Sequence, residues 1–234
     1  MAEPLFASTE KAENPWASIS DMMSGLMIIF LFISIAYMNS VTKEKDKVEE
    51  IAVMWNKTQE ELYLDLEREF KDDLQKWKAS LNRENLSVRF EEPSVLFETG
   101  SAALTSGFKA ILNDFFPRYI NVLRKYQGNI AEVRIEGHTS SEWVGSKSPL
   151  DAYFHNMQLS QDRTRAVLQY CLMLPALSSH LSWAVSTITA NGLSSSKPII
   201  TARGNEDPIL SRRVEFRVRT DAEKRIMTIL EGIK

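Results

Sequence analysis

The chain has 234 residues, of which 44% are hydrophobic, with a formal net charge of −3 and a single cysteine. This length accommodates one membrane helix and one domain of ordinary size, and the acidic balance argues against a general nucleic-acid binder, which carries a basic stripe. A single cysteine excludes an internal disulfide, and because Cys171 lies within an apolar run we expect it to be buried.

Residues 16–39 form a long apolar stretch with one acid, Asp21. As a helix this stretch is long enough to cross the core of a bilayer, so we predict one transmembrane helix. The preceding tail, residues 1–15, is acidic and no small-residue cleavage site follows, so we expect the helix to be retained rather than removed as a signal peptide. One helix cannot enclose an ion path, so any channel must be shared with other subunits.

Asp21 lies on a narrow stripe of small or hydroxylated residues, because its neighbours three and four residues away are Ala17, Ser18, Ser24 and Gly25. Small residues let another helix approach closely, and an acid at the centre of a membrane helix costs about 2.5–3.5 kcal/mol, so such acids usually face protein and have a function. We expect Asp21 to face partner helices and to carry protons. The alternative is that Asp21 only stabilises the first turns of the helix.

Residues 40–84 are highly charged and contain neither proline nor glycine, which predicts a helix that continues out of the membrane. The spacing of its apolar residues favours a coiled-coil linker in a dimer, or a helix packed along a partner. The alternative is a solvated helix with incidental apolar residues. The apolar positions are Val41, Val48, Ile51, Trp55, Leu62, Leu66, Phe70, Leu74, Trp77 and Leu81.

Residues 85–220 have the pattern of a compact α/β (α+β) domain with the element order β-α-β-α-β-β. Residues 221–234 are predicted to form a short amphipathic C-terminal helix. Within the domain, we predict strands at 86–90 and 95–97, a helix at 105–126, a strand at 131–138, a helix at 159–174, and strands at 183–190 and 214–219.

The sequence contains none of the common catalytic motifs. His138, His155 and His180 lack metal-binding spacing, and neither a nucleophile elbow nor a phosphate-binding glycine loop occurs. We therefore predict that the chain is not an enzyme and binds no metal or cofactor, and that His138 packs at the end of its strand.

Four blocks in the predicted domain occur in the order found in one family: FETGSAAL (97–104), IEGHT (135–139), NMQLSQDR (156–163) and RRVE (212–215). They resemble the OmpA-like peptidoglycan-binding domain. The resemblance implies that Arg163 clamps the terminal carboxylate of the diamino acid in the peptide stem, a task suited to the planar guanidinium fork. It also places at the binding site Phe97, Glu98, Thr139, Ser140, Asn156, Leu159 and Ser160.

One position departs from the family pattern. The strand end usually carries an acid that would bind the ammonium group of the ligand, and this chain has Ser140 there. Glu142 and Asp151 in the following loop are candidates to replace that acid. For Arg163 and Arg213, the alternative to ligand binding is a salt bridge that organises the fold.

The stretch WASISDMMSGLM (16–27) is similar to the B subunit of flagellar stators, and the acidic tail and charged linker look more like the B subunit of the Zorya anti-phage system. In such complexes a ring of A-type subunits, typically five, surrounds two B helices, and ions passing the acid turn the ring around a B dimer anchored to peptidoglycan. The resemblance implies that Asp21 carries the ion, with Ser24 beside it. One acid with few further oxygen ligands favours H⁺ over Na⁺.

The resemblance also implies a single-pass protein of the bacterial inner membrane, surrounded by lipid, with a cytoplasmic N-terminus and a periplasmic C-terminal domain. Lysines after the helix, Lys43, Lys45 and Lys47, weakly favour the opposite orientation. Two other functions stay open: a flagellar-type motility stator, and a static tether to peptidoglycan without ion transport.

Overall fold

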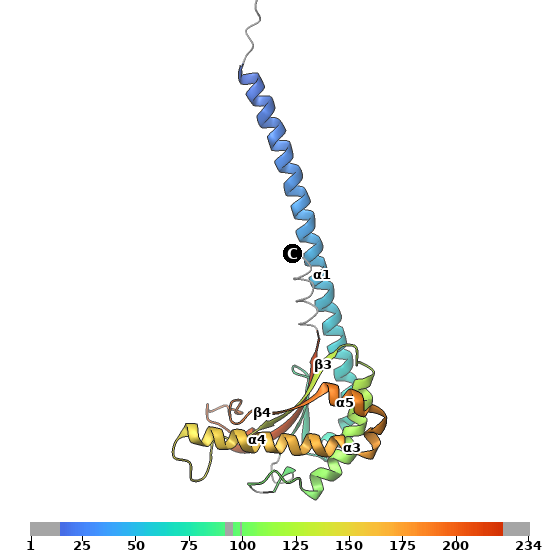
Figure 1. The fold of residues 1–234 in the computed structure, drawn as a ribbon, viewed down its shortest axis with the longest axis vertical. Helices are drawn as coiled ribbons and strands as arrows, with labels where there is room; N and C mark the ends of the chain where they lie inside the picture. The colour runs from blue at the N-terminus through green and yellow to red at the C-terminus, as the bar shows by residue number, and fades with distance from the viewer. Residues whose placement is uncertain (1–14, 92–95, 99, 222–234) are drawn as a thin grey trace, which may run out of the picture. The chain divides into compact units, whose positions relative to one another are not determined.

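The computed structural model describes residues 15–91, 96–98 and 100–221. The chain divides into two compact units, Met1–Glu50 and Ile51–Lys234, and each is described by itself (Figure 1). The predicted tail and the predicted C-terminal helix lie outside the described residues, apart from Pro15 and Asp221.

Helix α1, Pro15–Leu74, begins at a proline, which the first helical position accepts because it needs no hydrogen bond there. In the described part of the chain, its segment Ser18–Glu50 is the one helix long and apolar enough to cross a membrane. The large apolar side chains from Ile19 to Met38 are 47–77% exposed. They have no core within the first unit, which agrees with a helix that faces lipid or other chains.

The last turns of α1 belong to the core of the second unit. Leu62, Leu66 and Phe70 are at most 1% exposed, and Trp77 packs against Phe70 with ring centroids 5.9 Å apart. The prediction of a helical linker up to residue 84 is therefore wrong in its last part: α1 ends at Leu74, and Ala79–Asn82 form strand β1. The apolar spacing correctly predicted that these residues form a packed face. The face packs on the chain's own domain, however, and not on a partner helix. The side chain of Trp55 lies outside the described residues.

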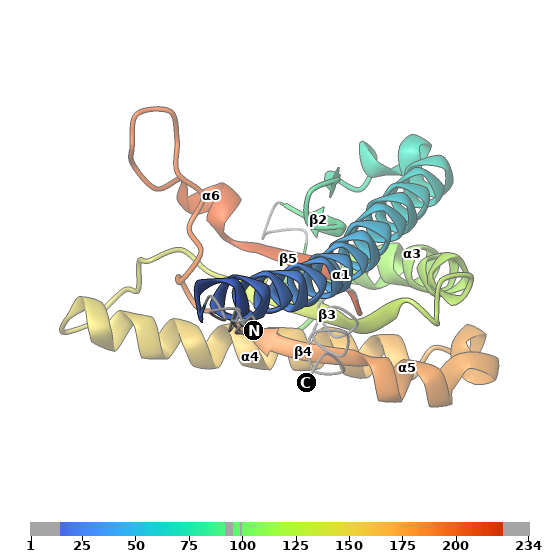
Figure 2. The same ribbon diagram turned by 90° about the horizontal axis from the view of Figure 1, so that it is seen from above.

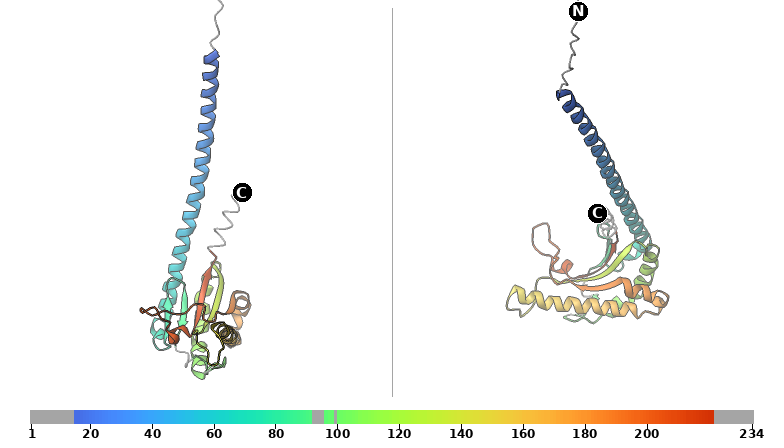
Figure 3. Two further views of the ribbon diagram at one scale, coloured as in Figure 1. Left: turned by 90° about the vertical axis from the view of Figure 1, so that its left-hand side faces the viewer. Right: turned by 45° about the horizontal axis from the view of Figure 1, so that its top comes forward.

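The second unit contains a five-stranded sheet with the order β1-β2-β5-β3-β4 (Figures 2 and 3). The other strands are β2 (Ser87–Phe90), β3 (Ile130–His138), β4 (Ile188–Gly192) and β5 (Arg213–Thr220). Neighbours are antiparallel except β3 and β4, which are parallel and need a crossover connection. Helix α4 (Pro149–Leu172) lies within this crossover and runs beside β4 (Figure 2).

Helices α3 (Ser106–Arg124) and α4 pack on one face of the sheet. Phe115 of α3 lies 5.1 Å, between ring centroids, from both Phe90 and Phe216 of the sheet. Cys171 is buried in this core, as predicted, and burial raises the pKa of its thiol. Because side chains alternate along a strand, the charged residues of β3 and β5 lie on the opposite face.

The prediction of a mixed α/β domain is confirmed, and β2-α3-β3-α4-β4-β5 reproduces the predicted order with β1 added before it. Three boundaries were wrong. Helix α4 begins at Pro149 rather than 159, because Ser148 caps it by accepting a hydrogen bond from the amide of Asp151 at 3.1 Å. The predicted strand 183–190 is helix α5 (Leu181–Thr187) followed by β4, after a 3-10 helix η1 (Pro175–His180). Phe97 forms only an isolated bridge with Leu104.

Candidate functional site

Two glycines let α4 lie directly on the sheet. Gly137 and Gly192 are opposite each other in the parallel β3–β4 pair. A Cβ atom on Gly192 would lie 2.4 Å from the amide nitrogen of Gln161, and one on Gly137 would lie 2.9 Å from the carbonyl oxygen of Ser160. Real Cβ atoms essentially never approach so closely, so the missing side chains set the height of α4 above the strands. This contact positions Arg163, which lies less than one turn further along α4.

A cleft of about 540 Å³ opens where β3 ends, between α4 and the loops that follow β3 and precede α3. It brings together seven of the eight residues predicted for peptidoglycan binding, from segments far apart in sequence. These are Phe97, Glu98, Thr139, Ser140, Asn156, Leu159 and Arg163.

Arg163 lies half-buried in the wall of the cleft. Its Nε donates a hydrogen bond to the carbonyl of Ser101 at 2.9 Å, and its guanidinium carbon lies 4.7 Å from the ring centroid of Phe97. No acidic side chain of the described residues pairs with it. Burial, and then the positive charge of Arg212, lower the pKa of Arg163 to about 10. An unpaired, partly desolvated guanidinium is suited to an incoming carboxylate.

The loop after β3 forms the opposite wall and is held from several sides. The amide of Thr139 donates to the carbonyl of Ser194 at 3.0 Å, and Asn156 Nδ2 donates to the carbonyl of Glu142 at 3.2 Å. The Thr139 hydroxyl is buried and has no hydrogen-bond partner within the described part of the chain. It is therefore a polar group that a ligand or water can satisfy.

Ser160 is the predicted residue that does not line this cleft. It is 1% exposed, donates to the carbonyl of Met157 at 2.9 Å and accepts from the amide of Ser194 at 3.1 Å. It borders a much smaller cavity of about 10 Å³ beneath the cleft, together with Arg163. Its position supports a structural role, in which it ties the loop after β4 to α4.

The two candidates for the missing acid differ in position. The carboxylate of Asp151 accepts a hydrogen bond from the amide of Lys147 at 2.9 Å and lies 3.4 Å from His155 Nε2, so it stabilises the start of α4 and does not line the cleft. Glu142 does line the cleft, and so does Glu98; both are exposed at its rim.

Four residues of the cleft wall were not predicted as site residues: Gly100, Trp143, Val144 and Arg212. Trp143 stacks on His155 with ring centroids 5.1 Å apart and 14° between the planes. Arg212 precedes β5, and its Nη1 donates to the Ser140 hydroxyl at 3.3 Å. The sequence did contain a signal for Arg212. It directly precedes the alternating strand, and adjacent side chains along a strand point in opposite directions, so Arg212 and Arg213 face different sides.

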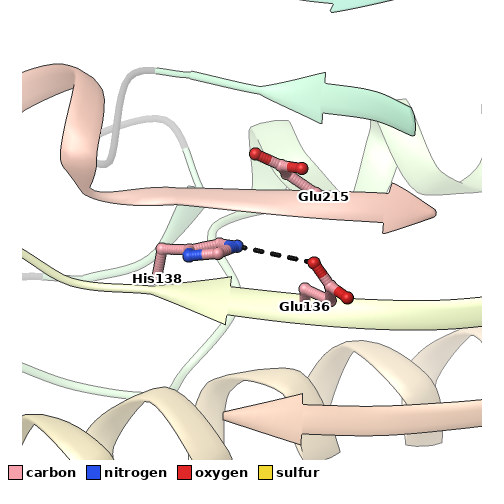
Figure 4. A group of neighbouring side chains, drawn as sticks. All are labelled: Glu136, His138 and Glu215. Carbon is pink, nitrogen blue, oxygen red and sulfur yellow. Dashed lines mark ion pairs between the residues drawn. The ribbon is translucent and has the colours of Figure 1, made fainter. Parts of the chain in front are cut away.

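The opposite face of the sheet contains a buried charged cluster. Figure 4 shows Glu136 and His138 facing each other along β3, with Glu215 beside them on β5; all three are 3–5% exposed. Glu215 Oε1 accepts hydrogen bonds from Arg213 at 2.6 Å and Arg89 at 3.0 Å. Burial alone would raise the pKa of Glu215, but these arginines hold it below its usual range. The interpretation of Arg213 as part of a salt bridge is confirmed.

Ligand atoms of Glu136, His138 and Glu215 lie within 4.8 Å of one another, a spacing that a metal ion could use. The surrounding charge argues against a cation, because Arg89 and Arg213 already pair with Glu215 and Arg217 Nη1 lies 3.9 Å from Glu136. Burial lowers the pKa of His138, and neither of its ring nitrogens has a hydrogen-bond partner among the described residues. We interpret the cluster as an ion-pair network around a neutral imidazole, and His138 packs at its strand end as predicted.

The second predicted site, in the first unit, consists of Asp21 and Ser24. Asp21 is exposed, and the Ser24 hydroxyl donates to the carbonyl of Ser20 at 2.8 Å, within its own helix. A Cβ atom on Gly25 would meet nothing within 4 Å, so this side of the helix is open. The side chain of Ala17 lies outside the described residues.

Comparison with known proteins identifies both the domain and the chain. Residues 96–215, which include every residue that lines the cleft, match the OmpA family. The fold and the cleft thus define a protein with an OmpA-family domain behind one long apolar helix. Over 216 residues the sequence is 51% identical to the Zorya protein ZorB of Escherichia coli, with 92% of each chain covered. The chain therefore belongs to the ZorB family, which confirms the resemblance found in the sequence.

A solved structure shares the fold, and a second one is similar to a lower degree. A putative MotB-like protein from Desulfovibrio vulgaris is 19% identical with a TM-score of 0.50, covering 74% of this chain and 94% of that one. The periplasmic domain of Helicobacter pylori MotB is 13% identical with a TM-score of 0.45, covering 66% of this chain and 89% of that one.

Proposed function

We propose that this chain is the B subunit of an ion-driven rotary motor in the bacterial inner membrane, anchored to peptidoglycan and active in anti-phage defence. Membership of the ZorB family supports the assignment to a Zorya complex, and the OmpA-family domain supports the anchor. The motor function rests on one observation, the acid Asp21 in the apolar segment of α1.

Asp21 is exposed in the single chain, and the stripe of Ser18, Ser24 and Gly25 next to it is exposed or open as well. Within a membrane an exposed acid costs free energy that partner helices can offset with hydrogen bonds. A ring of A-type subunits, about five as in the stators that the chain resembles, around a homodimer of this chain supplies such partners. Asp21 then alternates between a protonated form facing the ring and an ionised form open to water.

The membrane potential supplies the work, about 2.3 kcal/mol for each charge that crosses 100 mV. A proton fits this site better than a sodium ion, because Na⁺ needs several oxygen ligands and the stripe offers few. The N-terminus is cytoplasmic and the domain periplasmic in this proposal, since peptidoglycan lies outside the inner membrane.

The cleft supports the anchor through Arg163. Its guanidinium is half-buried and has no acidic partner among the described residues, so a carboxylate of the peptide stem can pair with it without displacing another anion. Leu159 provides apolar surface for the hydrocarbon parts of the stem, and the buried Phe97 ring supports the Arg163 guanidinium.

Replacement of Asp21 by Asn tests the motor function, because it preserves the shape of the side chain and removes its titration. We expect Asp21→Asn to abolish protection against phage in cells that carry the complete system. The matched control is Asp46→Asn on the same helix, which should protect like the wild type. Undiminished protection by Asp21→Asn would exclude the motor and leave the static tether.

Retention on isolated peptidoglycan tests the anchor. We expect the purified full chain to be retained, Arg163→Ala to be lost, and Arg165→Ala to behave like the wild type. Arg165 is on the same helix, but its side chain is 75% exposed and lies outside the cleft wall. A flagellar-type stator would also be retained on peptidoglycan through Arg163. In that case, however, Asp21→Asn would impair swimming rather than protection against phage.

A further inference from the structure

Two unpaired guanidinium groups line the cleft. Besides Arg163, the cleft wall contains Arg212, whose guanidinium donates a hydrogen bond to the uncharged hydroxyl of Ser140 at 3.3 Å. Neither arginine has an acidic partner within the described part of the chain. The adjacent Arg213, in contrast, pairs with Glu215 at 2.6 Å.

The two guanidinium groups come from different elements and are close enough to affect each other. Arg163 lies on α4 and Arg212 just before β5, and both also border the small cavity of about 10 Å³ beneath the cleft. The charge of Arg212 contributes to the lowered pKa of Arg163. Two like charges in a partly desolvated wall repel each other, and this repulsion disappears when each cation receives an anion.

The acids near the cleft do not neutralise this pair. Glu98 and Glu142 are exposed at the rim, and neither forms an ion pair within 4.0 Å with Arg163 or Arg212. The Arg212 guanidinium donates to Ser140, which accepts the hydrogen bond but carries no charge. The inner wall of the cleft is therefore cationic, and none of the described residues that line it is a buried acid that could receive an ammonium group.

We propose that Arg163 and Arg212 form a dicarboxylate subsite, which binds two carboxylates of one peptide stem and does not require an ammonium group on the ligand. This proposal rests on the proposed binding to peptidoglycan and specifies which chemistry of the stem is recognised. Each guanidinium can donate two parallel hydrogen bonds to one carboxylate. The apolar surfaces of Leu159, Trp143 and Val144 in the same wall favour a peptide with hydrocarbon segments over a free inorganic anion.

Calorimetric titration of the full chain in detergent micelles with modified stems tests the proposal without changing the protein. The probes are the soluble tripeptide stem that ends in the diamino acid, the same stem with its side-chain amine acetylated, and stems with one or the other carboxylate amidated. We expect acetylation to change Kd by less than about threefold and each amidation to weaken binding about tenfold or more. A loss of binding on acetylation as large as that on amidation would overturn the proposal.

Variants assign the second carboxylate to Arg212. We expect Arg212→Gln to weaken binding of the intact stem about tenfold and to remove the penalty of one of the two amidations. Ser140→Asp should weaken binding similarly, because the new carboxylate pairs with Arg212. Arg203→Gln is the control: it removes the same charge from an exposed loop residue outside the cleft wall and should bind like the wild type.

The outcomes separate this inference from the proposed function. If the wild type is retained on peptidoglycan and Arg163→Ala is not, but Arg212→Gln binds every stem like the wild type, the subsite is refuted and the anchor stands. If the wild type is not retained at all, the anchor itself fails. Displacement of the stem by inorganic phosphate at equal concentration would overturn the assignment to a peptide.

Discussion

Leu31 and Leu66 belong to the same helix, α1, and differ in what surrounds them. Leu31 is 59% exposed in the first unit, whereas Leu66 is fully buried in the second, against the core that α3 and the sheet share. In the first unit the apolar side chains of the described residues are exposed on every side of the helix, so its environment must come from lipid and other chains. The second unit packs its apolar side chains against its own elements.

The same difference separates the two candidate sites. The cleft is built within the chain, and hydrogen bonds among five segments hold its walls. Asp21 has no such surroundings, because the residues next to it on the helix are exposed. A site built within the chain can be analysed residue by residue, whereas the site at Asp21 is completed only by partner helices.

The largest expected effect comes from truncating the same residue type in both regions. Leu66→Ala should lower the free energy of unfolding of the second unit by about 3–5 kcal/mol, because it opens a cavity in a closed core. Leu31→Ala should leave it unchanged. Urea denaturation of the full chain in detergent, followed by tryptophan fluorescence, measures both, since Trp77 packs beside Phe70 in this core. Equal effects of the two substitutions would contradict the division into an exposed and a closed region.

A smaller effect is expected where α4 rests on the sheet. A Cβ atom on Gly192 would lie 2.4 Å from the amide nitrogen of Gln161, so Gly192→Ala must displace α4 and should cost about 1–3 kcal/mol. The displacement should also weaken retention on peptidoglycan, because Arg163 moves with the helix. Gly128→Ala is the control, since its Cβ atom would meet nothing within 4 Å. Normal retention of a destabilised Gly192→Ala would show that the cleft does not depend on the height of α4.

The next prediction concerns pH and the buried face of the sheet. Burial lowers the pKa of His138 below its unfolded value of about 6.5, so the unfolded chain binds the proton more readily. The contribution of His138 to the free energy of unfolding is therefore fully present above about pH 6.5. It decreases as the pH falls toward the folded pKa, by at most about 1.4 kcal/mol for each pH unit. We expect urea denaturation between pH 7.5 and 5.5 to show this decrease in the free energy of unfolding for the wild type and not for His138→Gln. His155→Gln, at a half-exposed position, should keep the decrease.

The sequence predicts those parts of the fold that the spacing of apolar residues determines. Apolar spacing identified Leu62, Leu66 and Phe70 as one packed face, but spacing cannot state which surface the face meets, so the coiled-coil interpretation placed it on a partner chain. Alternation around Trp183 and Val185 favoured a strand, yet only Ile188 onward pairs with β3, because tertiary pairing outweighs a short local pattern.

The cleft shows the same limit. Arg163 and Asn156 were predictable because they lie about two turns apart on the same face of α4, within a motif that resembles a known family. Arg212 was not predicted as a site residue, since its place in the cleft wall depends on the direction of its side chain just before β5. Ser160 was placed at the site by the resemblance of its block to a known family, but a helix turns adjacent residues to different sides, and Ser160 points away from the cleft that Leu159 lines.

The smallest expected effect tests what attaches the last turns of α1 to the domain. Glu60 accepts hydrogen bonds from Arg83 at 2.6 and 3.0 Å, and both side chains are more than one third exposed. Glu60→Gln should therefore cost less than about 1 kcal/mol, and the difference should shrink in 1 M salt, where the screening length is about 3 Å. Glu61→Gln, whose carboxylate has only a 3.9 Å contact with Lys57, is the matched control and should have no effect. A cost for Glu60→Gln as large as that for Leu66→Ala, and lost in 1 M salt, would mean that an ion pair, rather than apolar burial, holds this end of the helix.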